Sequence, residues 1–254
     1  MLKYILAIII FGVIIFIHEF GHFFVAKLCG IKVNKFALGM GPKILKKQIG
    51  ETEYSLRLFP VGGFCAMEGE DQESENSRAF GNKPVWKRMF VIVAGAFMNI
   101  LLGFVLIVIL TCMRSAVPST IVGGFSTQSE TSEIITAQSY ECGLREGDEI
   151  IKMDGMRIFT PSDLSYQLYS DDDGKFDIVV KRDGKKITLN DVIFHDSATD
   201  SVVDFQIKGL NKNPLNVLAF SGKDTVSTAR MIWISLVDLV TGKYGFNDLS
   251  GPVG

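Results

Sequence analysis

The sequence has little of the material from which most metal and nucleic-acid sites are built. Its 254 residues include only three histidines and four cysteines, and no two cysteines form a Cys-x-x-Cys pair. That spacing excludes a thiolate zinc site and gives no disulfide framework. The formal net charge is −2, so the chain also lacks the basic excess that phosphate binding requires. We therefore expect no nucleic-acid partner.

Long apolar runs are what the sequence does have. Residues 4–17 and 89–113 contain no charged residue. A helix as long as the second run covers about 37 Å, more than the ~30 Å hydrocarbon core of a bilayer. The first run continues through residues 18–28, HEFGHFFVAKL. A signal peptide would also explain it, but only Lys3 precedes it, no small-residue cleavage site follows, and this C-terminal half carries charged and polar groups. The prediction is two transmembrane helices, at 1–30 and 85–114.

The distribution of lysine and arginine predicts how these helices are oriented. Lys27, Lys32 and Lys35 follow the first run, and another basic cluster, residues 83–88, precedes the second. Because cytoplasmic loops carry the excess of basic residues, residues 27–88 are expected in the cytoplasm. The N-terminus and the segment after Met113 are then expected outside.

The remaining chain reads as a small module followed by one more helix. Residues 118–207 alternate short apolar runs with turn signals, which predicts a soluble α+β module. Within it, Thr160-Pro161 predicts a helix start, and residues 176–181 and 185–189 around Asp183-Gly184 predict a hairpin. The module could be a spacer or a peptide-binding domain.

Residues 214–254 begin with a stretch that is apolar but interrupted by charges. The charged residues are Lys223, Asp224, Arg230 and Asp238, and the longest uncharged stretch, 231–237, is too short to cross a membrane. The pattern predicts an amphipathic helix at the membrane surface. A surface helix of a soluble domain is the alternative.

His18, Glu19 and His22 form a His-Glu-x-x-His motif inside the first apolar run. Two histidines four residues apart lie on one helical face and can bind one Zn²⁺, and the adjacent glutamate can take a proton from a metal-bound water. On an amphipathic helix the same pattern is often a solvated face. Here His18 lies about 24 Å along the helix, where unpaired ionisable groups cost several kcal/mol. Zinc coordination removes that cost.

The chain offers no obvious third zinc ligand near these histidines. The only other histidine, His195, falls in the soluble module, and the second apolar run contains no aspartate, glutamate or histidine. Catalytic zinc sites usually have three protein ligands and a water. The third ligand is unknown from residues 1–254.

With its intramembrane His18–His22 motif, the chain resembles the bacterial site-2 proteases, which are intramembrane zinc metalloproteases. Further segments match that family's motifs in the same order, including a stretch typical of bacterial PDZ domains and a segment that precedes the family's last spans. These segments are Phe36–Pro42, Tyr54–Phe64, Ala94–Gly103, Glu141–Gly155 and Leu249–Gly254.

The resemblance implies a fold. It is a multi-pass α-helical membrane protein with a membrane-associated β-hairpin in residues 31–84 and an inserted α+β PDZ-like domain in residues 118–207. Family members supply the third zinc ligand from an aspartate on a later span, so that ligand is expected beyond Gly254 and the sequence reads as truncated before it.

The resemblance also implies substrate contacts at Asn99, Gly62 and Gly63, with the hairpin receiving the substrate as an added strand. For Asn99, interhelical hydrogen bonding is an equally good reading. Gly95 and Gly103 are interpreted as allowing close helix packing.

The function predicted is that of a zinc endopeptidase in the bacterial cytoplasmic membrane, with Glu19 as general base. Its substrate would be a transmembrane segment of a single-pass protein, such as an anti-sigma factor or a signal-peptide remnant. The PDZ-like domain would be extracytoplasmic. The alternative is an inactive membrane adaptor that binds partners through the PDZ-like domain, and the missing third ligand is the feature that favours it.

Overall fold

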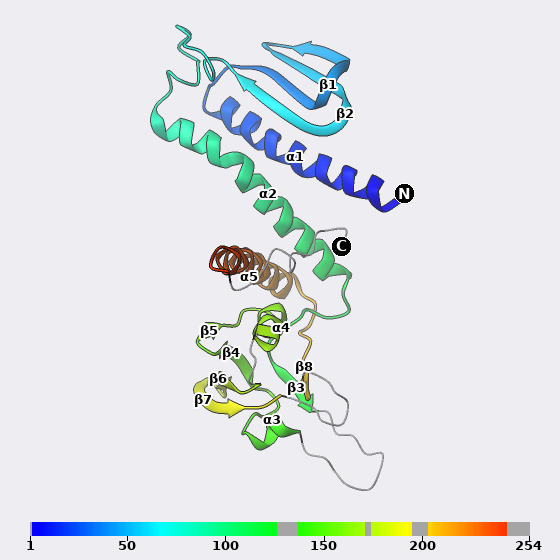
Figure 1. The fold of residues 1–254 in the computed structure, drawn as a ribbon, viewed down its shortest axis with the longest axis vertical. Helices are drawn as coiled ribbons and strands as arrows, with labels where there is room; N and C mark the ends of the chain where they lie inside the picture. The colour runs from blue at the N-terminus through cyan, green and yellow to red at the C-terminus, as the bar shows by residue number, and fades with distance from the viewer. Residues whose placement is uncertain (1, 126–136, 171–173, 195–202, 243–254) are drawn as a thin grey trace. The chain divides into compact units, whose positions relative to one another are not determined.

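The computed structural model describes residues 2–125, 137–170, 174–194 and 203–242. The chain divides into two compact units, one up to Val105 and one from Leu106 onward (Figure 1). Each unit has its own core. Two features of the sequence, His195 and the segment 249–254, lie outside the described residues.

The first unit consists of two long helices and a two-stranded sheet. Helix α1 is Leu2–Leu28 and helix α2 is Val85–Met113, which continues a short way into the second unit. Both are long and apolar enough to cross a membrane, and only 6% and 11% of their most apolar stretches are buried. A core helix of a soluble protein would be mostly buried, so the exposed side chains are suited to lipid.

Strands β1 (Val33–Ile49) and β2 (Thr52–Met67) form a long antiparallel hairpin between the helices in sequence. Its pairing runs from Ile49 opposite Thr52 to Val33 opposite Met67, with repeated register shifts between. Such bulges bend and twist a strand pair. At Gly39 (φ +84°) a Cβ atom would lie 2.4 Å from the Phe59 carbonyl oxygen, so the crossing of the strands there requires glycine.

The base of the hairpin packs on the end of α1 and the start of α2. The shared core contains the residues Ala26, Cys29, Ile31, Val33, Phe36, Cys65, Met67 and Val91. Further along, β2 lies against α1 itself: a Cβ on Gly12 would meet the Pro60 carbonyl oxygen at 3.0 Å. The hairpin is thus held along the helix that carries His18 and His22.

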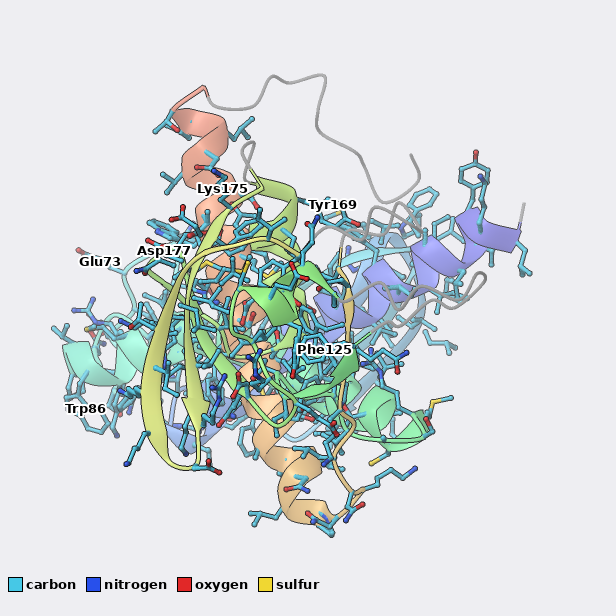
Figure 2. The ribbon with its side chains drawn as sticks, turned by 90° about the horizontal axis from the view of Figure 1, so that it is seen from below. Glu73, Trp86, Phe125, Tyr169, Lys175 and Asp177 are labelled. Carbon is cyan, nitrogen blue, oxygen red and sulfur yellow. The ribbon has the colours of Figure 1, made fainter. Side chains whose placement is uncertain are left out.

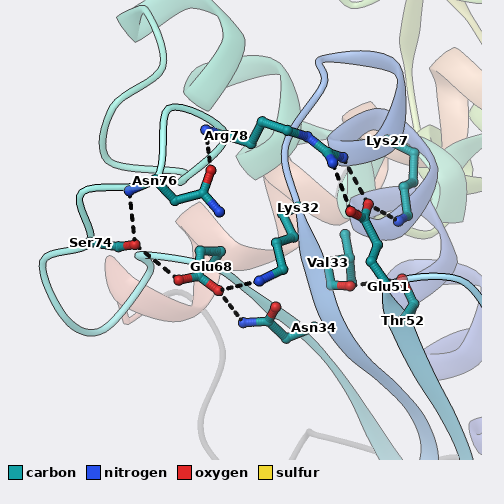
Figure 3. A network of polar contacts seen from close by, with 10 residues as sticks. All are labelled: Lys27, Lys32, Val33, Asn34, Glu51, Thr52, Glu68, Ser74, Asn76 and Arg78. Carbon is teal, nitrogen blue, oxygen red and sulfur yellow. Dashed lines mark hydrogen bonds and ion pairs between the residues drawn. The ribbon is translucent and has the colours of Figure 1, made fainter. Parts of the chain in front are cut away.

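A polar network joins the hairpin turn to the end of α1 and to the loop before α2 (Figure 3). Glu51 at the turn accepts hydrogen bonds from Lys27 (2.7 Å) and from both terminal nitrogens of Arg78 (2.7 and 2.8 Å). These two cations, Arg78 first, lower the pKa of Glu51 from 4.5 to about 2. The carboxylate therefore stays ionised in the folded protein to low pH.

This network predicts an acid-dependent loss of stability. A carboxylate whose folded pKa is depressed stabilises the fold above its unfolded pKa, and this contribution disappears as pH falls toward the folded pKa. Wild type should exceed Glu51→Gln in free energy of unfolding by about 1 kcal/mol or less above pH 4.5. The difference should vanish as pH falls from 4.5 to about 2. Thermal denaturation in detergent checks it; a difference that is constant across this window would contradict the assignment.

The second unit is an α+β module with a helix packed on it. A four-stranded antiparallel sheet has the order β5-β4-β6-β7, and β3 (Val122–Phe125) pairs separately with β8 (Phe205–Ile207). The sheet strands are β4 Glu149–Met153, β5 Met156–Arg157, β6 Phe176–Arg182 and β7 Lys185–Val192. Helices α3 (Gln138–Glu141) and α4 (Pro161–Ser170) complete the module.

The predicted hairpin at 176–189 is confirmed as β6 and β7. Asp183 and Gly184 at its turn have φ values of +49° and +80°, as a two-residue primed turn requires. At the other end of β6, Asp177, labelled in Figure 2, bonds the loop of the preceding hairpin: its N–H donates to the Asp154 carboxylate at 2.8 Å. Local turn chemistry therefore determines this part of the module.

The predicted start of α4 at Pro161 is confirmed, but Thr160 does not cap it with its side chain. Asp163, in the first turn, accepts the N–H groups of Phe159 (2.7 Å) and Thr160 (3.0 Å) through one carboxylate oxygen. The carboxylate reaching back to the helix start is the reciprocal half of a capping box. This leaves the second oxygen of a fully buried aspartate for another partner.

That partner is helix α5 (Pro214–Val240). Asn213 caps α5 by accepting the N–H of Asn216 at 2.7 Å, and proline occupies its first turn. Arg230 donates to the second oxygen of Asp163 at 2.7 Å, and Ser227 donates to the same oxygen. Helix α5 is therefore bonded to the module at a buried position.

Candidate metal centre

The first unit brings His18 and His22 face to face on helix α1. The helix runs unbroken through the motif, so the two residues lie one turn apart on the same side. Their Nε2 atoms are 3.1 Å apart. Two nitrogens that bind one tetrahedral zinc at ~2.0–2.1 Å are separated by about 3.3 Å. The pair is within a few tenths of an ångström of that separation.

Helix α2 supplies a hydrogen bond that orients His22. The Nδ1 atom of His22 lies 2.7 Å from the carbonyl oxygen of Val91. A carbonyl oxygen can only accept, so Nδ1 carries the proton and Nε2 keeps its lone pair. Metal-binding histidines are usually held by such a partner on the other ring nitrogen. The contact therefore sets His22 in the tautomer that can bind a metal.

Asn99, two turns further along α2, contacts His18. Its Nδ2 atom is 3.3 Å from His18 Nδ1, and its Oδ1 atom is buried with no hydrogen-bond partner among the described residues. The amide nitrogen and oxygen exchange places when the side-chain amide turns by 180°. In the turned orientation Oδ1 accepts a hydrogen bond from the Nδ1–H group of His18, and His18 Nε2 then keeps its lone pair, as in His22.

Gly95 lies directly over the paired nitrogens. A Cβ atom at this position would be 2.5 Å from His22 Nε2 and 2.7 Å from His18 Nε2. Only glycine lets the backbone of α2 come this close to the two nitrogens. The donor set, two imidazole nitrogens 3.1 Å apart, fits one Zn²⁺ ion bound by His18 and His22.

Glu19 faces strand β2, whereas His18 and His22 face helix α2. A Cβ added to Gly63 of β2 would lie 3.3 Å from Glu19 Cγ, so the stem of this side chain runs along the backbone of the hairpin. Gly62 (φ +90°) contacts Met40 instead. The structure thus brings His18, His22 and Asn99 together at α2, and Glu19 and Gly63 together at β2, within one unit.

The assignment of Gly95 to helix packing agrees with the structure, in which Gly95 and Gly21 both let α2 come close to α1. Sequence did not show that Gly95 packs against the two histidines, or that the Val91 carbonyl contacts His22. Gly95 lies four residues, about one helical turn, before Asn99. Helix geometry alone would therefore have placed the two residues on the same face of α2. The Val91 carbonyl had no sequence signal because it belongs to the backbone. In the described part of the chain, no cluster of three or more metal-binding side chains occurs.

Comparison with known proteins gives a consistent answer. The model of Peptidase family M50 matches residues 6–254. A protein of Clostridium acetobutylicum named as a candidate zinc metalloprotease is 34% identical over 252 residues, covering 98% of this chain and 71% of that protein. A similarly named protein of Clostridium perfringens is 35% identical over 251 residues, covering 98% and 72%. The regulator of sigma-W protease RasP of Bacillus subtilis is 28% identical over 338 residues, covering 97% and 77%.

The chain therefore belongs to Peptidase family M50, the site-2 proteases. It is a zinc metalloprotease, and Zn²⁺ is its cofactor. The resemblance stated from the sequence motifs is confirmed. With two helices apolar and long enough to cross a bilayer, the chain is a membrane-associated protein.

Proposed function

We propose that this protein is an intramembrane zinc endopeptidase that cleaves a transmembrane segment of a single-pass membrane protein. The observation that carries the proposal is the pair of Nε2 atoms on α1, 3.1 Å apart and in close contact with Gly95 of α2. Both helices at this site have the length and composition of membrane-crossing helices. His18 and His22 are proposed as the zinc ligands.

Glu19 is the proposed general base. Bound zinc polarises a scissile carbonyl and lowers the pKa of a water molecule. Glu19 adjoins His18 in sequence, takes a proton from the attacking water and returns one to the leaving amine. Because its stem lies along Gly63 of β2, a peptide that pairs with this strand would pass beside the carboxylate. Gly62 and Gly63 are therefore proposed to border the substrate.

Asn99 is proposed to hold His18 in the metal-binding tautomer, with its amide turned so that Oδ1 accepts from Nδ1. The turn gives this buried oxygen a donor, which it lacks among the described residues in the other orientation. This role is compatible with the contact between helices that the sequence suggested, because the bond joins α2 to α1. A contact of the same amide group with substrate is the alternative role.

The third zinc ligand is proposed to come from beyond Gly254. Two imidazoles leave the metal with fewer protein ligands than catalytic zinc sites usually have, and the described residues offer no cluster of three or more candidate ligands. The relatives are longer: 71% and 72% of the two clostridial proteins align with this chain. An aspartate on a later span is the expected ligand.

The substrate is proposed to be an anti-sigma factor or a signal-peptide remnant. The name of the Bacillus subtilis relative connects that protease with sigma-W regulation. The module 118–207 is proposed to be PDZ-like and to bind a peptide or limit access of bulky substrates. The protein is placed in the bacterial cytoplasmic membrane as a multi-pass protein.

Reconstitution tests the proposed activity. The protein, extended to include the later spans, is placed in vesicles with a single-pass protein whose only apolar segment is its transmembrane helix. Cleavage within that helix should stop on chelation and return with Zn²⁺, as mass spectrometry of the fragments would show. Zinc binding with no cleavage of any transmembrane segment would instead support the adaptor.

The proposed orientation predicts where cysteine reagents react. In a variant without the four native cysteines, Ser77→Cys tests the 27–88 region and Ser162→Cys tests the α+β module; both serines are exposed. An impermeant maleimide applied to intact cells with a permeable outer envelope should label position 162, and position 77 only after the membrane is opened. The reverse pattern would invert the topology.

A further inference from the structure

The outward face of α5 is a large apolar surface that catalysis does not use. At 3.6 residues per turn its residues fall within an arc of about 80°, and all are between 51% and 87% exposed. They are Leu215, Leu218, Val226, Trp233, Leu236 and Val240. We call this arc the apolar face of α5. The four charged residues of the helix all project outside it.

The opposite side of α5 packs on the α+β module. Val217, Ser221 and Ser227 are buried there. Arg230 donates to the carbonyl oxygen of Arg157 at 2.7 Å as well as to Asp163. Removing Asp163 from water requires these partners, since an unpaired buried charge is costly. The bonds therefore fix which side of α5 faces the module and which side is left outward.

The start of α5 is attached to the C-terminal end of α2. Lys212, two residues before the helix, donates to the carbonyl oxygens of Cys112 (2.7 Å) and Arg114 (3.1 Å). Val117 and Leu210 exchange backbone hydrogen bonds of 3.1 and 2.8 Å beside it. If α2 crosses the bilayer, as the proposed function holds, this end lies at the membrane boundary, and α5 begins there.

The first turns of the helix remain close to that boundary. Asn216, Ala219 and Lys223 of α5 line one cavity with Val117 and Pro118, which follow the end of α2 by a few residues. Helix α5 is not among the helices apolar enough to cross a membrane in the described part of the chain. A helix in this position with one apolar side is suited to lie in the interface plane.

We propose that the apolar face of α5 docks on the lipid bilayer, parallel to its surface, and holds the α+β module against the membrane. The occupant is lipid rather than a soluble partner because the helix starts at the end of a membrane-crossing segment. Trp233, at 68% exposed, stands in the middle of the face, and tryptophan favours the boundary between headgroups and acyl chains. The Arg230–Asp163 bond links α5 to the module, so a helix bound to the membrane keeps the module there as well.

Tryptophan fluorescence in the full chain tests the proposal. The chain has two tryptophans, so Trp86→Phe leaves Trp233 as the only one. The protein is reconstituted in phosphatidylcholine and phosphatidylglycerol vesicles whose acyl chains are brominated near the headgroup or near the tail end. Trp233 should be quenched more strongly by the first lipid than by the second, and be protected from aqueous acrylamide.

Two further variants separate the outcomes. Thr228→Trp, combined with Trp233→Phe, puts the probe on an exposed position outside the apolar face and should be quenched by acrylamide but not by lipid. Leu106→Trp, as the only tryptophan of the protein, probes α2 itself. Its fluorescence should be quenched by brominated lipid if α2 crosses the bilayer. Lipid quenching at 106 with none at 233 would overturn the docking of α5 alone, and no quenching at 106 would overturn the crossing of α2. Protection of Trp233 that depends on protein density rather than on brominated lipid would assign the face to a second copy.

Discussion

Replacing Gly95 with alanine is expected to remove zinc from this protease. The new Cβ would lie 2.5 Å from His22 Nε2 and 2.7 Å from His18 Nε2, closer than non-bonded atoms approach. The imidazoles can yield only by rotating apart, which breaks the pair that binds the metal. Zinc affinity should fall by more than the ~10–100-fold that loss of an outer partner of a ligand typically costs. Metal content after dialysis against graded chelator measures it.

Gly103→Ala is the matched control. It lies on the same helix, and no atom lies within 4 Å of its Cβ position. Both substitutions raise helix propensity by the same amount, roughly 1 kcal/mol, so any difference between them reflects the space above the histidines. If Gly95→Ala retained zinc as well as Gly103→Ala does, the metal could not lie between the two Nε2 atoms and α2.

Glu19→Gln is expected to keep zinc and lose proteolysis. Glutamine preserves the shape of the side chain against Gly63, but its amide cannot take a proton from water at neutral pH. Removing a general base typically costs ~10²–10⁴-fold in rate. The measurement pairs single-turnover cleavage of a transmembrane substrate with zinc content, using the protein with its later spans. His22→Ala serves as the contrasting variant, because it should lose both.

The exposed carboxylate Glu73 provides a control for the change of charge. It lies in the loop before α2, away from the motif, so Glu73→Gln should cleave at the wild-type rate. A Glu19→Gln protein that cleaves as fast as Glu73→Gln would remove Glu19 from the mechanism. Zinc lost together with activity in Glu19→Gln would instead make Glu19 a metal ligand, which is the first alternative for the unidentified third ligand.

Local sequence patterns were sufficient for several elements. The uncharged runs predicted the two apolar helices, because length and lack of charge decide membrane insertion residue by residue. Asp183-Gly184 predicted its hairpin because only a few residues tolerate the positive φ angles of that turn. The spacing of His18 and His22 predicted a shared helical face for the same kind of reason. Each of these inferences depends on neighbours in sequence, and each agrees with the structure.

What local sequence patterns did not predict are contacts between residues that lie far apart along the chain. Thr160-Pro161 correctly predicted the start of α4, but not that Asp163 accepts the N–H groups of Phe159 and Thr160 there. The other oxygen of Asp163 is held by Arg230, 67 residues away. Gly95 was correctly predicted to allow close helix packing, but nothing near it in sequence shows that α2 crosses α1 at the histidines. The close approach that allows this crossing occurs at Gly21 and Ala94.

The sequence by itself determined which groups are available for chemistry: a pair of imidazoles and a carboxylate set in an apolar helix, where unpaired ionisable groups are costly. It also determined which segments are suited to lipid. The tertiary structure decided what surrounds that chemistry. The Val91 carbonyl orients His22, Gly95 lets α2 come close to both nitrogens, and Glu19 runs along β2, because helix crossing and strand packing bring together residues that are 40 to 80 positions apart. Spacing along a chain defines a face, but only packing defines what that face meets.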